Sequence, residues 1–217
     1  MAAYTRQMVK VDNQPRKRPT QERARLTFDA IVEAAEQLLG RMSLAELTVQ
    51  AIAERAGVSV GSFYQYFPTK EAVVATVVER DVDSVYSVME TLFRASSGQP
   101  LERLIGVMVQ GILSTFASRL QFYRNVLPEI ARLEREGSIR NVSERAASLI
   151  LEAASQRSAE VAVPPERLEM AAFLVARTPN LMAHAAVIER PELLADAGFA
   201  QELTQLTTAY LLGSPRS

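Results

Sequence analysis

The chain has no cysteine, and it has one histidine among 217 residues. Without cysteine it forms no disulfide framework and offers no thiolate ligand to a metal. A single histidine makes a zinc site built from the protein's own side chains unexpected. We therefore expect neither a bound metal nor another cofactor, and the sequence argues against a disulfide-stapled secreted protein.

Long apolar runs are also absent. The longest charge-free, apolar-rich stretch, residues 104–118, is shorter than the roughly 18 residues that a membrane-spanning helix needs. The N-terminus lacks the apolar region of a signal peptide. We therefore expect a soluble, cytoplasmic protein with no membrane segment. Apolar residues still make up 48% of the chain, which at this length supports a sizeable core.

Enzyme motifs are missing as well. The sequence contains no phosphate-binding glycine loop, no Gly-x-Ser-x-Gly elbow, no Cys/His pair and no His-Glu-x-x-His segment. Glu79, Asp81 and Asp83 cluster, but their pattern indicates a solvated helix face. An enzyme on an all-helical scaffold is therefore a weak alternative.

Charge is unevenly distributed along the chain. Residues 1–70 contain ten Lys/Arg against seven Asp/Glu, whereas residues 71–217 contain fourteen against eighteen. Met1–Pro19 is basic, contains two prolines and has no periodicity, so we predict that it is disordered. This arm could contact DNA phosphates or the minor groove, or it could be a solvated tail, and the sequence leaves both readings open.

The stretch from Thr48 to Lys70 carries the most informative pattern. Thr48 precedes an apolar-periodic segment, as a helix N-cap does, and Gly57 follows it, where a left-handed C-cap favours glycine. Ser59 can cap a second short helix that is small and polar at its start and aromatic at its end. Two short helices joined in this way are typical of a DNA-binding helix-turn-helix.

This stretch resembles the DNA-binding signature of the TetR family of bacterial transcriptional regulators. The resemblance covers about Thr20–Val78, and the matching positions include Ala53, Gly57, Val58, Tyr64, Phe67 and Lys70. By this resemblance, three residues hold DNA phosphates: Thr48, Tyr64 and Lys70. Four others face the major groove: Ser59, Val60, Gly61 and Ser62. Tyr66, which stands where many members have histidine, completes the predicted DNA-binding set.

Helical periodicity continues beyond this motif, so we predict an all-α protein of about nine helices. We expect a basic arm (1–19), a three-helix helix-turn-helix DNA-binding domain (20–68) and a helical effector-binding and dimerisation domain (69–217). A long helix over about 69–95 leads from the DNA-binding domain into the last one. Phe63 and Phe67 are expected to lie in the core of the DNA-binding domain.

Apolar side chains of the last domain could line a pocket for a small, mainly apolar effector, or they could be plain core. The resemblance favours a pocket in this domain, and the candidates are Met89, Phe93, Met108, Ile112, Phe116, Phe122, Tyr123 and Arg177. Gly106 and Gly111 indicate close packing or room for a ligand. Arg177 could meet an anionic effector or a carboxylate, and His184 could be a core, interface or ligand-contacting residue.

The C-terminal segments predict self-association. The segment 166–188 is apolar on nearly all sides, so it needs burial on more than one side. In the family resembled, this helix and the last one form a four-helix bundle between two chains. The predicted interface residues are Ala172, Val175, Ala176, Leu203, Leu206 and Tyr210.

These observations predict a homodimeric transcriptional regulator that binds a near-palindromic double-stranded DNA operator. Repression is the favoured mode of regulation. A small effector in the second domain would release the operator by changing the spacing of the two DNA-binding domains. A regulator that is controlled by a protein partner, or by no effector at all, is the alternative that the sequence leaves open.

Overall fold

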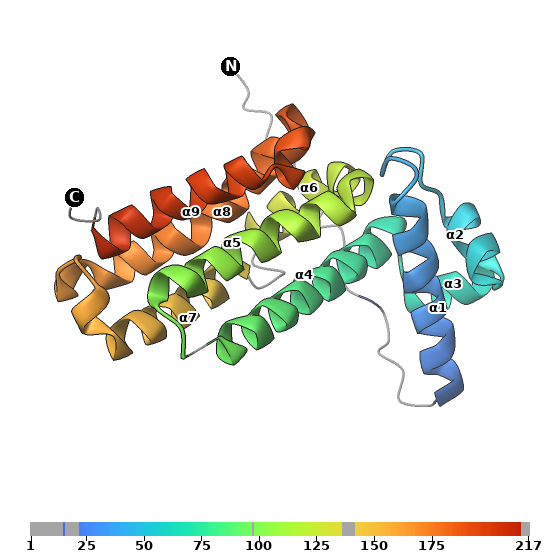
Figure 1. Ribbon diagram of the computed structural model, residues 1–217. Coiled ribbons are helices and arrows are strands. Elements are labelled where there is room, and N and C mark those ends of the chain that lie inside the picture. Colours follow the sequence, from blue (N-terminus) through green and yellow to red (C-terminus); the bar gives the residue numbers. More distant parts are fainter. Residues whose placement is uncertain (1–14, 16–21, 97, 136–141, 214–217) are drawn as a thin grey trace, which may run out of the picture. The chain divides into compact units, whose positions relative to one another are not determined.

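A computed structural model of the chain describes residue 15 and residues 22–96, 98–135 and 142–213. In these residues, nine α-helices and three short 3-10 helices follow one another, and no strand occurs (Figure 1). The all-α prediction of about nine helices is confirmed. The predicted basic arm lies almost wholly outside the described residues.

The helices belong to two compact units, Met1–Val77 and Val78–Ser217. The division falls within α4 (Lys70–Ala95), a single helix of 26 residues. The sequence placed the boundary earlier, between residues 68 and 69. The reason for the difference is that the first turns of α4 pack with the N-terminal unit.

The first unit contains α1 (Glu22–Leu39), α2 (Val49–Ala56), α3 (Val60–Tyr66) and the beginning of α4. α1 packs against α2, and α2 packs against α3. The apolar stripe of α1 is buried, and it consists of Phe28, Ile31, Val32, Ala35 and Leu39. This spacing of three and four residues is what buries one face of an amphipathic helix.

The second unit contains the rest of α4, α5 (Leu101–Ser118), α6 (Leu120–Arg135), α7 (Val142–Gln156), α8 (Leu168–Glu189) and α9 (Ala197–Leu212). The 3-10 helices Ser158–Glu160, Pro165–Arg167 and Pro191–Ala195 lie in its connections. α8 packs against α7, α5, α6 and α9, and α5 packs against α9. α8 is therefore central to the core of this unit.

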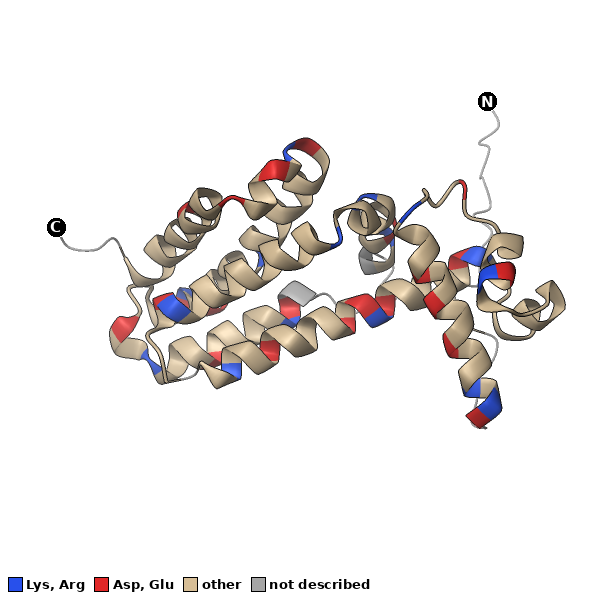
Figure 2. Cartoon of the chain, turned by 45° about the vertical axis from the view of Figure 1, so that its right-hand side comes forward, with Lys and Arg blue, Asp and Glu red and all other residues tan. Residues whose placement is uncertain are grey.

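Polar contacts attach the second-unit part of α4 to its neighbours. Asp81 is buried, and its carboxylate accepts hydrogen bonds from the Tyr123 hydroxyl (2.9 Å) and from the guanidinium of Arg119. Asp83 is exposed and pairs with Arg145 of α7. α4 carries bands of both charge signs along its length (Figure 2). For Asp81 the prediction of a solvated face is wrong, because its partners come from a distant segment of the chain.

His184 lies half-buried on α8, with its ring 5.2 Å from that of Phe116 in an edge-to-face arrangement. Burial, with a smaller contribution from the positive charge of Arg177, lowers the pKa of His184 from 6.5 to about 4. The imidazole is therefore neutral near pH 7. Its place against Phe116 supports the reading of His184 as a core residue.

Because the pKa of His184 is lower in the folded chain than in the unfolded chain, protonation of this residue favours unfolding. Its contribution to stability is complete above about pH 6.5 and is lost as the pH falls towards about 4. Between pH 7 and pH 5 we expect the free energy of unfolding to drop by about 2 kcal/mol more in the wild type than in His184→Asn. Urea unfolding at both pH values measures this difference, and equal pH dependence in the two chains would contradict it.

Candidate nucleic-acid interface

The start of α2 is fixed by its own N-cap. Thr48 has an extended backbone, and its Oγ1 accepts a hydrogen bond from the amide of Ala51 (3.1 Å). This bond satisfies one of the unpaired amides in the first turn of the helix. The hydroxyl proton of Thr48 remains available to a further acceptor, and the residue is exposed. A phosphate oxygen is such an acceptor.

Gly57 forms the turn between the two helices. Its φ of 68° and ψ of 30° lie in the left-handed region, which side-chain-bearing residues adopt at a cost. The amide of Val58 then donates to the carbonyl of Ala53 (3.0 Å), as in the C-cap of a helix. The predicted left-handed turn is confirmed, and it leaves only Val58 and Ser59 before α3 begins.

The start of α3 is capped in the same way as that of α2. Ser59 Oγ accepts a hydrogen bond from the amide of Ser62 (3.0 Å), and the two hydroxyls lie 2.9 Å apart. The outer face of α3 consists of exposed residues: Val60, Gly61, Tyr64 and Gln65. Their spacing of one and four residues places them along one side of the helix. The four predicted groove-facing residues, Ser59 to Ser62, all lie on or next to this surface.

The inner face of α3 rests on aromatic side chains. Phe63 and Phe67 are fully buried. The ring of Phe67 stacks on that of Phe28 from α1 at a centroid distance of 4.9 Å and lies 5.8 Å from that of Phe63. The prediction that Phe63 and Phe67 are core residues is confirmed. Tyr66, predicted to contact DNA, is half-buried with its ring edge-to-face against Phe28, at a centroid distance of 6.2 Å, so part of its surface serves this core.

Lys70 has different partners from those expected of a phosphate-binding residue. Its Nζ donates hydrogen bonds to the backbone carbonyls of Leu44 (2.9 Å) and Leu47 (2.8 Å), and its side chain is half-buried. An ammonium group has three N–H donors, so at most one remains for a phosphate. The sequence did not indicate these carbonyl partners.

Gln65 is an exposed residue of α3 that the sequence-based set omitted. An amide side chain can pair with adenine in the major groove through two hydrogen bonds. The signal that would have identified Gln65 is helical period, since it lies four residues after Gly61. α3 itself contains no charged residue, so its outer face offers amides, hydroxyls and apolar groups to bases.

The predicted effector-pocket residues lie in the interior of the second unit. Seven of them are buried, namely Met89, Phe93, Met108, Ile112, Phe116, Phe122 and Tyr123, and Arg177 is half-buried. The rings of Phe116 and Tyr123 are 4.2 Å apart between centroids, and those of Phe122 and Tyr123 are 5.3 Å apart. These aromatic side chains fill space by packing on one another.

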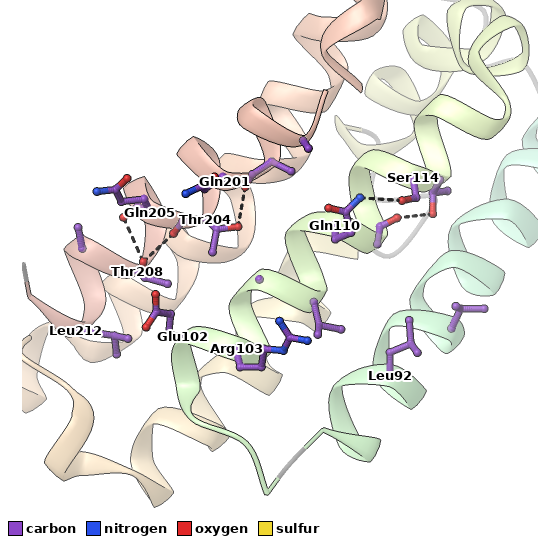
Figure 3. Close-up of a pocket in the computed structure, with 18 of the residues that line it drawn as sticks. Leu92, Glu102, Arg103, Gln110, Ser114, Gln201, Thr204, Gln205, Thr208 and Leu212 are labelled. Carbon is purple, nitrogen blue, oxygen red and sulfur yellow. Dashed lines mark hydrogen bonds between the residues drawn. The ribbon is translucent and has the colours of Figure 1, made fainter. Parts of the chain in front are cut away.

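A groove of about 1500 Å³ opens on another face of α5, towards α9 (Figure 3). None of the eight predicted pocket residues lines it. It is lined by small and polar residues of α5 and α9, including Gly106, Gly111, Gln110, Thr204 and Thr208, with Val88 and Leu92 of α4. The prediction followed the apolar face of α5, whereas this groove lies over its small and polar face.

The predicted dimer-interface residues divide into two groups. Ala172, Val175, Ala176 and Leu203 are buried within the single chain, so they have no surface to offer a partner. Only Leu206 and Tyr210, exposed by 62% and 44%, are accessible. For the four buried residues the prediction is wrong, because the apolar face on which they lie is already covered by the unit's own helices.

Residues 31–77 match the family model described as bacterial regulatory proteins, tetR family. This segment includes α2, α3, both N-caps and Lys70. The HTH-type transcriptional regulator EthR of Mycobacterium tuberculosis is 35% identical over 89 residues, which are 41% of this chain and 41% of that protein. TtgR of Pseudomonas putida is 34% identical over 99 residues, which are 46% and 45% of the two chains. The chain thus spans less than half the length of these curated relatives.

Solved structures resemble a larger part of the chain. SmeT, described as the repressor of the Stenotrophomonas maltophilia multidrug efflux pump SmeDEF, has a TM-score of 0.62 at 23% identity, with 88% of this chain and 93% of that chain covered. A tetR-family transcriptional regulator from Streptomyces coelicolor has a TM-score of 0.62 at 20% identity, with 83% and 77% covered. At these identities the likeness shows the fold.

Gly61 gives a direct test of the outer face of α3. A Cβ at this position would meet only Ser59 Oγ, at 3.7 Å, so Gly61→Ala fits the fold and removes the helix-destabilising effect of glycine. We expect the melting temperature to stay constant or rise while DNA binding weakens about tenfold, since the added methyl prevents close approach to base edges.

Thermal melting and a DNA titration measure both effects. Gly111→Ala is the matched control, because a Cβ on Gly111 meets no atom within 4 Å and lies in the second unit. Unchanged DNA affinity in Gly61→Ala would contradict the assignment of the outer face of α3 as the surface that reads DNA.

Proposed function

We propose that the chain is a DNA-binding transcriptional regulator of the tetR family, and specifically a repressor, because residues 31–77 match the model of that family. The observation that carries this proposal is the outer face of α3, which is exposed, uncharged and held in place from beneath. The relatives EthR, TtgR and SmeT are named as regulators or as a repressor, which supports a regulator in preference to an enzyme. Its place of action would be the cytoplasm, where bacterial DNA lies.

α3 would read bases in the major groove. Its seven residues span about 10 Å, and the groove is about 12 Å wide. Gln65 would pair with adenine, and Val60, which is 41% exposed, would contact a thymine methyl group. Small Gly61 would allow the backbone to approach these bases closely.

Phosphates would be held at the edges of this surface. Thr48 has a hydroxyl proton available beside the N-terminus of α2, where the helix dipole favours an anion. Tyr64 is 43% exposed and carries a phenolic hydroxyl. Neutral donors of this kind fix the register of a protein on the duplex. Most of the attraction to phosphate would then come from arginine and lysine side chains elsewhere.

We propose that the regulator is a homodimer joined through α8 and α9. Exposed apolar side chains follow α8 at heptad-like intervals, and they are Met170, Phe173, Leu174, Leu181, Met182 and, near its end, Ile188. Leu206 and Tyr210 add to them from α9, which packs against α8. Exposed apolar patches on soluble proteins mark interaction sites, whereas single exposed apolar residues do not. A second copy presents the same patch, so a two-fold contact covers both.

The composition of α8 supports the same proposal. With the preceding turn, Pro165–Glu189 is long and apolar enough to cross a membrane by composition alone, although core helices of soluble proteins meet the same criterion. One side of α8 packs against α7, α5 and α6. The apolar side chains left exposed need a cover, and a second chain provides it without a bilayer. Two chains on one axis would present two α3 helices to a near-palindromic operator.

We propose that a small effector, if one controls the regulator, binds in the groove between α5 and α9. The groove is open, whereas the predicted pocket residues around Tyr123 pack on one another. Its lining mixes apolar groups with Arg103, Gln110 and Gln201 (Figure 3), which favours an amphiphilic molecule over the mainly apolar one expected from the sequence. A screen of compounds for release of bound DNA, run in parallel on the wild type and on Gly111→Leu, tests this proposal. An effector that binds in the groove should release DNA from the wild type and not from Gly111→Leu, because the added side chain fills part of the groove. If the regulator has no effector, no compound should release its DNA.

Selection of bound duplexes from a random pool tests the DNA-binding proposal. We expect enrichment of a sequence with two related half-sites about one helical turn apart. Gln65→Ala should reduce discrimination at one position in each half-site by about 1–3 kcal/mol, whereas Tyr64→Phe should weaken binding to all duplexes equally. Recovery of no preferred sequence by the wild-type chain would contradict the proposal.

Substitution of the exposed α8 stripe tests the homodimer. Leu181 is 55% exposed, so Leu181→Lys leaves the fold of one chain intact but places a charge in the proposed interface. We expect this variant to sediment as a monomer and to lose most of its operator affinity.

Val88→Lys is the matched control for Leu181→Lys, because Val88 is 57% exposed on α4, away from the α8 stripe. It should remain dimeric in sedimentation. A monomeric wild type, or a dimeric Leu181→Lys, would contradict the proposed interface.

A further inference from the structure

The segment that leads into α2 is a closed turn. The backbone amide and the hydroxyl of Ser43 both donate to Glu46 Oε2, at 2.9 and 2.7 Å. These bonds lower the pKa of the Glu46 carboxyl. The amides of Glu46 and Leu47 both donate back to the carbonyl of Ser43, at 3.1 Å. The Ser43 end of the turn is therefore held by hydrogen bonds within the turn. The backbone carbonyls of Leu44 and Leu47 need donors from elsewhere.

Lys70 satisfies two of those carbonyls. Its Nζ lies 2.9 Å from the oxygen of Leu44 and 2.8 Å from that of Leu47, which are 26 and 23 residues earlier in the chain. A charged donor makes a stronger hydrogen bond than a neutral one. The half-buried position of the side chain shields these bonds from water. The start of α4 is thus joined to the turn that leads into α2.

The joined turn ends directly at the N-cap of α2. The side chain of Leu47 is fully buried, and Thr48 follows it with its Oγ1 on the amide of Ala51. Leu47 is therefore held at both its carbonyl and its side chain, directly before the N-cap residue Thr48. Lys70 has then used two of its three N–H donors within the protein.

We propose that Lys70 is a positioning residue for the α2 end of the DNA surface, and that its ammonium group acts through the Ser43–Leu47 turn rather than as a phosphate ligand. This inference rests on the proposed DNA-binding function. A phosphate ligand contributes a charge to the contact, whereas a positioning residue contributes the orientation of another group, here the Thr48 hydroxyl. Salt dependence separates the two, because each ionic phosphate contact adds about 0.9 to the slope of log affinity against log salt.

The test compares Lys70→Met with the wild type on the duplex selected from the random pool. Methionine keeps an unbranched side chain as far as Cε and removes the ammonium group with its charge and its donors. We expect binding to weaken about tenfold with an unchanged salt slope. The matched control is Thr69→Ala, which removes the cap of α4 on the amide of Ala72 and leaves the Ser43–Leu47 turn untouched. This control should lose stability and keep its DNA affinity.

Thr48→Ala completes a double-mutant cycle with Lys70→Met. If Lys70 acts by orienting Thr48, the two losses of affinity are not additive, and the double variant binds about as weakly as the weaker single variant. Hydrogen exchange of the Ala51 amide in the DNA-free protein reports how well Thr48 caps the start of α2. This exchange should be faster in Lys70→Met than in Thr69→Ala.

Two results would overturn the inference. A salt slope reduced by about one contact would make Lys70 a phosphate ligand, and unchanged affinity with a lower melting temperature would make it a structural residue only. If the wild-type chain binds no duplex, the proposed function fails on that result. The exchange rate of the Ala51 amide then still decides whether Lys70 orders the start of α2.

Discussion

The packing of Phe63 and Phe67 against Phe28 is the interaction on which the DNA-facing surface depends. α3 has seven residues, far fewer than the roughly 12–15 that an isolated helix needs to persist in water. It exists because these buried rings hold it to α1, and each buried phenylalanine contributes about 2–3 kcal/mol. The N-cap at Ser59 begins a helix that the aromatic core makes stable. Without that core, the cap would have no helix to begin.

In the second unit a buried carboxylate has a comparable role. A charge removed from water is costly unless hydrogen bonds and an opposite charge surround it. Asp81 has both, from Tyr123 and Arg119. Loss of Arg119 would remove a positive charge from beside this buried carboxylate, so the pair favours one arrangement of α4 and the α5–α6 junction. The apolar helices around α8 supply most of the burial, and this polar contact specifies how α4 joins them.

Local features of the chain were predictable from sequence, and long-range partners were not. The caps at Thr48 and Ser59 and the left-handed turn at Gly57 depend on residues at most three or four positions away. The partners of Lys70 lie 26 and 23 residues away, and Tyr123 lies 42 residues from Asp81. Periodicity showed that α8 has two apolar sides. It could not show which side the chain covers itself, and for that reason the predicted interface included buried alanines.

The two faces of α3 use different residues. Phe63 belongs to the core, while Val60, Gly61, Tyr64 and Gln65 are exposed on the outer face. Inward and outward positions can therefore change at independent rates during evolution. A gene duplicate could acquire a new target sequence through a few outward substitutions without passing through an unfolded intermediate. Relatives of this chain should then share the Phe63 and Phe67 framework while their outward positions diverge with the DNA that each one reads.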